Sequence, residues 1–235
     1  MPSPRPTIDV RDAILSHAAR LFAARGFDGT SLQEVAAAVG IRKPSLLYHF
    51  PSKDELRRAV LGQLLSRWND VLPRLLFAAT SGEGRFDAVL GEMVAFFSDD
   101  PDRARLLVRE ILDRPVEMGE LVSLHVPKWV AMVCSYIRKG QEEGAIYPDV
   151  DPEAYTVQVI NLVVAGVATW GTIGAIASTD RIRTHAPRLP ARHIAEMKRV
   201  AKASLFRPAA APTARKSRAA SRTPRAPRAR RDGER

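Results

Sequence analysis

The sequence predicts an all-α protein. Apolar residues recur at helical spacing along most of the chain, as Ile14, Ala18 and Phe22 do near its start. No stretch shows the apolar–polar alternation of a strand, and no hairpin turn is recognisable. With 235 residues, of which 46% are apolar, the chain is long enough to bury a sizeable core.

Charge is distributed unevenly. The chain carries a formal charge of +10, and residues 207–235 contribute ten basic and two acidic side chains, or +8 of it. This segment is rich in Pro, Ala, Ser and Arg, so we expect it to be a disordered basic tail. We expect residues 1–8, which are rich in proline, to be disordered as well. The beginning of the chain lacks an apolar signal core, and the single cysteine, Cys134, excludes an internal disulfide.

Three short helices are expected within residues 9–53. The first covers 9–25 and ends at Gly26. The second covers 31–38; Thr30 and Ser31 can each cap it, and Thr30-x-x-Gln33 has capping-box spacing. Gly40 ends this helix, and Pro44 suits the first turn of a third helix at 43–49. A tight turn between two short helices is the spacing of a helix-turn-helix, whose last helix enters the DNA major groove.

A larger helical domain is expected over residues 54–206. Ser52 can cap its first helix, 53–77, in which Pro73 is expected to produce a bend. Helical periodicity then predicts helices over 86–98, 102–113, 116–143, 152–178 and 190–205.

The N-terminal motif resembles a known family. Gly26-Phe27, Thr30-Ser31, Val35-Ala36, Gly40-Ile41, His49-Phe50 and Lys53 occur in the order and spacing of the tetracycline-repressor (TetR) family of bacterial regulators. The resemblance covers about residues 9–56. It implies a helix-turn-helix DNA-binding domain, followed by a larger helical domain that binds a ligand and forms a homodimer.

The resemblance also implies a set of DNA-binding residues. Thr30 or Ser31, together with Lys53, would hold phosphates, and the groups nearest the bases would be Gln33, Lys43, Ser45, Tyr48 and His49, with Pro44 among them. Lys donates to guanine, Gln pairs with adenine, and hydroxyls serve backbone or base.

The sequence departs from the family pattern at one of these positions. The family's phosphate-binding Tyr falls at Leu47, and the aromatic residue lies one position later, at Tyr48. Simpler readings remain open for three of the others: Thr30 or Ser31 as a plain cap, His49 as a packed histidine and Lys53 as surface charge.

A single short reading helix offers few base contacts, so a homodimer on a palindromic operator is expected. Residues 154–179 carry no charge, and Gln158, Asn161, Ala165, Thr169 and Thr172 form a small, partly polar stripe. We therefore expect 152–178, packed with 190–205, to form the two-fold interface. A membrane span is the disfavoured alternative, because it would separate the DNA-binding domain from the basic tail. A buried helix outside the interface is a further alternative.

In the family, the middle of the chain encloses an effector pocket. The residues predicted to line it are Met93, Phe97, Arg109, Trp129 and Met132. Plain core packing is the alternative for the apolar members, and an ordinary ion pair is the alternative for Arg109.

The expected function is that of a cytoplasmic, nucleoid-associated transcriptional regulator, most often a repressor, released from DNA by a small molecule. No catalytic residues, metal site or cofactor are expected, because the five histidines are scattered and no phosphate-binding loop is present. A structural DNA-binding protein is the second hypothesis and an enzyme the third. Two interpretations of the basic tail remain open: it neutralises phosphates without reading bases, or it is a solvated extension of no consequence.

Overall fold

The computed structural model describes residues 9–78, 82–173 and 191–208. Within these ranges it contains ten helices: α1 (Val10–Arg25), α2 (Leu32–Val39), α3 (Lys43–His49), α4 (Lys53–Ala78), α5 (Gly82–Asp99), α6 (Pro101–Asp113), α7 (Pro115–His125), α8 (Pro127–Glu142), α9 (Pro152–Ile173) and α10 (Ala191–Leu205). The all-α prediction is confirmed. The predicted segments 1–8, 174–178 and 209–235, and residue 190, lie outside the described residues.

The first three helices have the caps that their sequences favour, with one shift. Asp9 caps α1 by accepting from the Arg11 amide at 3.0 Å. The capping box of α2 is formed by Ser31 and Glu34, each side chain bonding to the other's backbone N–H. The predicted Thr30–Gln33 box is therefore wrong by one residue. The hydroxyl of Thr30 is turned inward, which leaves the capping position to Ser31.

The tight turn between α2 and α3 depends on Gly40. Its φ of 80° lies in the left-handed region, where a side chain would be strained. The Gly40 amide donates to Ala37 O and the Ile41 amide to Ala36 O, so the last carbonyls of α2 are satisfied. The chain then enters α3, in which Pro44 occupies the first turn.

One expected helix of the larger domain is divided. The predicted helix 116–143 is two helices, because Pro127 has no N–H to continue the ladder and its ring would clash with the preceding turn. Pro73, in contrast, lies inside α4 without ending it. The described backbone also forms an isolated antiparallel bridge between Ile146 and Phe206, which ties the loop after α8 to the end of α10.

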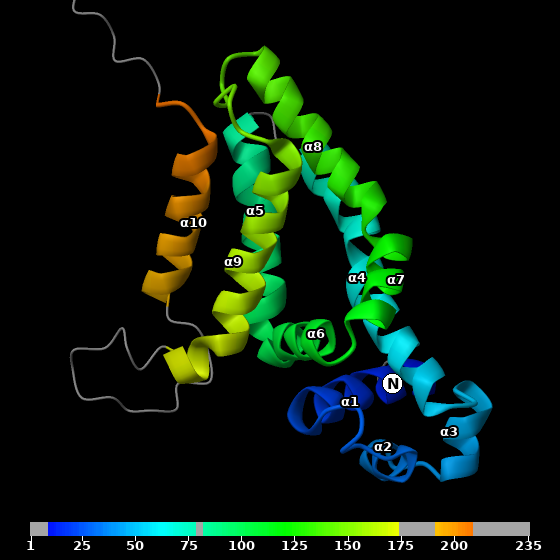
Figure 1. Cartoon of the computed structure of the whole chain (residues 1–235). Coiled ribbons are helices and arrows are strands. Elements are labelled where there is room, and N and C mark those ends of the chain that lie inside the picture. Colours follow the sequence, from blue (N-terminus) through cyan, green and yellow to red (C-terminus); the bar gives the residue numbers. More distant parts are fainter. Residues whose placement is uncertain (1–8, 79–81, 174–190, 209–235) are drawn as a thin grey trace, which may run out of the picture.

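The helices are arranged as a small head and a larger bundle. In Figure 1, α1, α2 and α3 lie at one end of the molecule, and α4 runs from this head into the bundle formed by α5, α8, α9 and α10. Helix α6 lies across the base of the bundle, where it packs against both α1 and α9. The head therefore meets the bundle through α4 and α6.

Candidate nucleic-acid interface and internal cavity

The apolar side of helix α3 packs against the rest of the head, and its polar side faces solvent. Leu46 is fully buried and Phe50 is 4% exposed, and both belong to the core of the head. Because these two side chains attach α3 to its neighbours, a helix of seven residues needs no stability of its own. The predicted base-reading residues Lys43, Pro44 and Ser45 are exposed on it.

The two aromatic side chains at the end of α3 have different environments. Tyr48 is 86% exposed, whereas His49 is half-buried. Their rings meet edge to face, with centroids 5.4 Å apart. Leu47, which occupies the position of the family's tyrosine, is half-buried. Tyr48 is thus the large side chain that this surface offers to a groove.

Thr30 and Ser31 are separated by the fold. Thr30 is 2% exposed, and its hydroxyl donates to Gly26 O at 2.9 Å and lies 3.2 Å from Leu21 O. A hydroxyl has one proton, so the Thr30 side chain has no donor left for a phosphate. The prediction of a phosphate contact by the Thr30 side chain is therefore corrected to an internal hydrogen bond. Ser31 is exposed at the N-terminus of α2, and Gln33 is exposed in its first turn.

Lys53 begins α4, and its side chain lies against the head. Its Nζ is 4.3 Å from the centroid of the Phe27 ring, and the residue is half-buried. The Phe27 ring thus holds Lys53 beside α3.

Sequence reasoning did not single out Arg42. This residue precedes α3 directly, is exposed and makes no capping bond through its side chain. Together with Lys43 it places two cations at the start of the exposed helix. The signal was the Arg-Lys pair immediately after the Gly40 turn, and guanidinium groups bind phosphate and guanine well.

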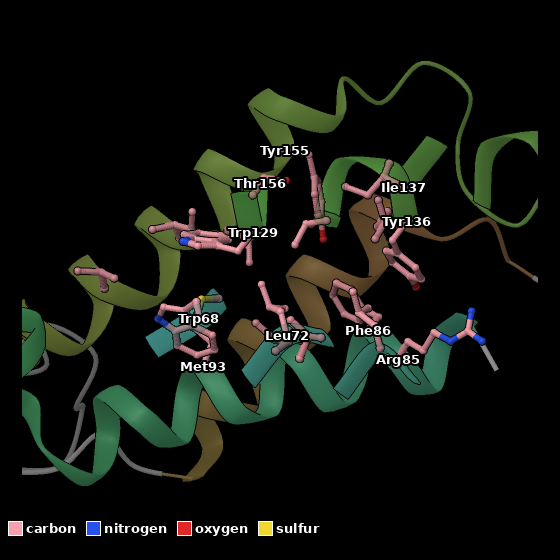
Figure 2. A pocket seen from close by; sticks show the side chains of 18 of the residues that line it. Trp68, Leu72, Arg85, Phe86, Met93, Trp129, Tyr136, Ile137, Tyr155 and Thr156 are labelled. Carbon is pink, nitrogen blue, oxygen red and sulfur yellow. The ribbon is translucent and has the colours of Figure 1, made fainter. Parts of the chain in front are cut away.

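An internal cavity of about 120 Å³ lies in the bundle, between α4, α5, α8 and α9. Three of the five predicted lining residues, Met93, Phe97 and Trp129, are part of its wall. Figure 2 shows Trp68 and Met93 near Trp129 at one end, and Tyr136, Ile137 and Arg85 at the other. Sequence reasoning missed the contribution of α4, which is made by Leu64, Leu65, Trp68, Leu72 and Leu76.

The other two predicted lining residues lie elsewhere. The guanidinium of Arg109 is packed against Gly26, so close that a Cβ added to Gly26 would stand 3.0 Å from its Nη1. Arg109 therefore belongs to the contact between α6 and the head. Met132 is on α8 but is not part of the cavity wall. Helix periodicity alone does not show which side of a buried helix meets the empty space.

The three hydroxyl groups in the cavity wall are bonded within the protein. Tyr136 donates to Gly82 O at 2.5 Å, Tyr155 to Ala201 O at 2.6 Å, and Thr156 to Pro152 O at 2.7 Å. Desolvation raises the pKa of Tyr136 to about 12, and it also raises the pKa of Tyr155. The indole N–H of Trp129 is buried with no acceptor among the described residues. The cavity surface is consequently almost entirely hydrocarbon.

Helix α9 leaves an uncharged face of apolar and small polar side chains uncovered. Val157 is 50% exposed, and Gln158, Asn161, Ala165 and Thr172 of the predicted stripe are exposed; Thr169 is half-buried. By length and composition α9 could cross a membrane, but only 22% of its most apolar window is buried within the chain. Val200 on the neighbouring α10 is 44% exposed.

A comparison with known families identifies the head. The model of the family described as bacterial regulatory proteins, tetR family, matches residues 14–60. This match covers α2 and α3 completely and extends into α4. The head of this chain is therefore similar to the DNA-binding domain of the TetR family.

Two transcriptional regulators of the helix-turn-helix type align over more of the chain. The transcriptional regulator RutR of Escherichia coli K12 is 33% identical over 137 residues, which are 56% of this chain and 63% of RutR. The chain thus spans just under two thirds of that relative. EthR of Mycolicibacterium smegmatis is 28% identical over 165 residues, 68% of this chain and 74% of EthR. These relatives are described as regulators, in agreement with the expectation of a non-catalytic protein.

A solved structure shares the fold. The ketosteroid transcriptional regulator KstR2 of Mycobacterium tuberculosis superposes with a TM-score of 0.63 at 17% identity, over 85% of this chain and 96% of that one. Within residues 9–78, 82–173 and 191–208, no three His, Cys, Asp or Glu side chains are grouped to hold a metal ion.

Proposed function

We propose that this protein is a TetR-family transcriptional regulator, acting as a repressor, that binds a palindromic operator as a homodimer and is released by a small molecule. The observation that carries the proposal is the exposed face of α3. Leu46 and Phe50 fix this helix from below, while Lys43, Ser45 and Tyr48 face outward. Lys43 suits guanine, and the ring of Tyr48 suits a thymine methyl group or a sugar.

Phosphate contacts are assigned to the surroundings of α3. Ser31 lies at the N-terminus of α2, where backbone N–H groups favour an anion. Lys53 and Arg42 flank α3 at its two ends and supply positive charge. His49, half-buried beside Tyr48, is given a supporting role at the edge of this surface. These contacts fix the register, and α3 reads the bases.

A homodimer is proposed because a single head makes few base contacts and would bind DNA with low specific affinity. Two heads on half-sites about 34–36 Å apart, or a multiple of this, provide specific affinity. The exposed uncharged face of α9 supports an interface between two copies, since such a face on a soluble protein marks an interaction site. Helix α10 extends the same surface through Val200. A second copy packed on this face would shield α9 from water, so α9 would not have to lie in a membrane. This agrees with a cytoplasmic protein acting at the nucleoid.

Release by a small molecule is proposed because one helix serves both sites. Helix α4 begins at Lys53, directly after α3, and supplies the cavity wall from Leu64 to Leu76. A molecule that fits the cavity in only one arrangement of α4 biases the positions of the two heads by its differential affinity.

The test is selection of bound duplexes from a random pool, followed by footprinting. A regulator protects one palindrome, whereas a structural DNA-binding protein covers DNA broadly. Removal of residues 207–235 examines the proposed role of the basic tail: the salt dependence of binding should weaken while site preference is kept. Broad coverage without a preferred palindrome would contradict the proposed regulator.

A further inference from the structure

The shape of the cavity restricts what it can hold. On α5 the lining residues extend from Arg85 to Phe97, twelve residues apart, which is about 18 Å along the helix. On α9 they extend from Tyr155 to Val164, about 14 Å. The lining residues therefore follow both helices, and we call the elongated space of about 120 Å³ that they enclose the slot.

The chemistry of the wall restricts it further. The three lining hydroxyls, those of Tyr136, Tyr155 and Thr156, have each donated their proton to a backbone carbonyl. A charged group placed among such side chains would lose its hydration, and the single indole N–H of Trp129 could replace little of it, although it suits one uncharged oxygen acceptor. The raised pKa of Tyr136 reflects the same poorly solvating surroundings.

The Arg85 end of the slot offers no excess positive charge. Lys202 of α10 binds both Glu83, at 3.0 Å, and Asp87, at 2.8 Å. Arg85 and Lys202 thus supply two positive charges at this end, and Glu83 and Asp87 supply two negative charges. Figure 2 shows the Arg85 guanidinium directed away from the side chains that enclose the cavity. A carboxylate therefore has no net attraction to this end.

We infer that the effector is an uncharged, elongated and largely hydrocarbon molecule that lies lengthwise between α5 and α9. The inference rests on the proposed function only in calling this molecule an effector. An anionic amphiphile with its head at Arg85 is the competing occupant. A compact ring would leave much of the slot unfilled.

Binding can be measured through the protein's own tryptophans. Of the three in the chain, Trp68 and Trp129 line the cavity, whereas Trp170 lies outside its wall and packs against the ring of His193 at a tilt. In the full-length Trp170→Phe protein the emission therefore reports the cavity. Three probes are titrated at about pH 8, where a carboxylate is ionised: the methyl ketone undecanone, undecanoate of equal length, and cyclohexanone.

Undecanone is expected to change the emission saturably and to bind at least about tenfold more tightly than either of the other probes. Equal or tighter binding of undecanoate would establish the anionic occupant and overturn the proposal. Equal binding of cyclohexanone, or no binding of undecanone, would overturn it as well.

Two filling variants locate the site. Val159→Phe on α9 and Val133→Phe on α8 each place a ring in the cavity wall, and Val116→Phe, at a position 73% exposed on α7, is the matched control. Far-UV circular dichroism confirms that each variant is folded. At least one folded filling variant should bind undecanone about tenfold more weakly, with the control unchanged; full binding in both would place the ligand elsewhere. The titration contains no DNA, so it can fail while operator binding holds.

Discussion

Arg57 of α4 donates through Nη1 to Oε2 of Glu110 on α6 at 2.7 Å, and each side chain is only 2% exposed. The guanidinium also lies 5.3 Å from the centroid of Phe27, in the loop after α1. Its Nε is buried and has no hydrogen-bond partner in the part of the chain that the structure describes, since Asp54 Oδ1 stands 4.0 Å away. The pair thus joins the head to the two helices that connect it to the bundle.

The first prediction concerns this pair. Glu110→Ala leaves the buried guanidinium of Arg57 with only the exposed Asp54, 4.0 Å from its Nε, as a counter-charge, so the free energy of unfolding should fall by about 3–5 kcal/mol. The double variant Arg57→Met/Glu110→Leu removes both charges and should recover most of that loss. Urea denaturation measures both, with Glu120→Ala on the exposed side of α7 as the control. If the single and double variants lost equal stability, the pair would not be the source of the effect.

The second prediction concerns pH and the cap of α2. The backbone N–H of Ser31, together with its hydroxyl, holds the pKa of Glu34 below its ordinary value of 4.5. A lowered pKa in the folded state means that the ionised carboxylate contributes stability above about pH 4.5 and loses this contribution as the pH falls through the folded value. The advantage of the wild type over Glu34→Gln in urea denaturation should be full near neutral pH and shrink below pH 4.5.

A control separates the cap from general acid denaturation. In the Ser31→Ala background the hydroxyl donor is absent, so the pH-dependent difference between Glu34 and Gln should be smaller. A difference that grew on acidification would contradict the assigned direction of the pKa shift.

Sequence reasoning was most successful where a short stretch of chain decides the structure. The helix boundaries of the head follow from Gly26, Gly40 and Pro44. The helix predicted over 43–49 coincides with α3. Thr30 and Ser31 could not be told apart, because both offer a hydroxyl before the same helix. Tertiary packing turns Thr30 inward, toward Gly26 O, and leaves Ser31 to cap.

Residues that meet across long sequence distances were harder to assign. Arg109 and Glu110 are adjacent on α6, yet one packs against Gly26 and the other binds Arg57. Helix periodicity gives the direction of a side chain but not the identity of its partner from another helix. Met93, Phe97 and Trp129 lie in the cavity wall and Met132 does not, a distinction that helix periodicity alone cannot make.

The third prediction compares two helical glycines. A Cβ on Gly140 of α8 would stand 2.5 Å from Cδ1 of Ile146, whereas a Cβ on Gly119 of α7 meets nothing within 4 Å. Gly140→Ala should therefore destabilise the protein by about 1–3 kcal/mol through overpacking. Gly119→Ala should stabilise it by about 0.5–1 kcal/mol through helix propensity. Thermal unfolding of both variants checks the opposite signs, and shifts of the same sign would contradict the packing argument.

The fourth prediction concerns base reading. If Lys43 donates to a guanine, Lys43→Ala should cost about 1–3 kcal/mol on the selected operator and relax preference at one position in each half-site. Lys128→Ala, an exposed lysine on α8, is the control for lost charge. Binding to a panel of single-base operator variants is the measurement. An equal loss on all sequences, with a shallower salt slope, would reassign Lys43 to a phosphate.

The fifth prediction concerns the exposed face of α9. Ala165 lies on it with its side chain exposed, so Ala165→Arg would place a charge at the centre of the proposed two-fold interface. Light scattering after gel filtration should show a monomer for this variant, and a dimer for Ala131→Arg, which alters an exposed alanine on α8. The monomer should retain helical content but lose most of its operator affinity, because each half-site then binds a head independently. A variant that remained dimeric with full operator affinity would move the interface away from α9 and leave its uncharged face to another partner.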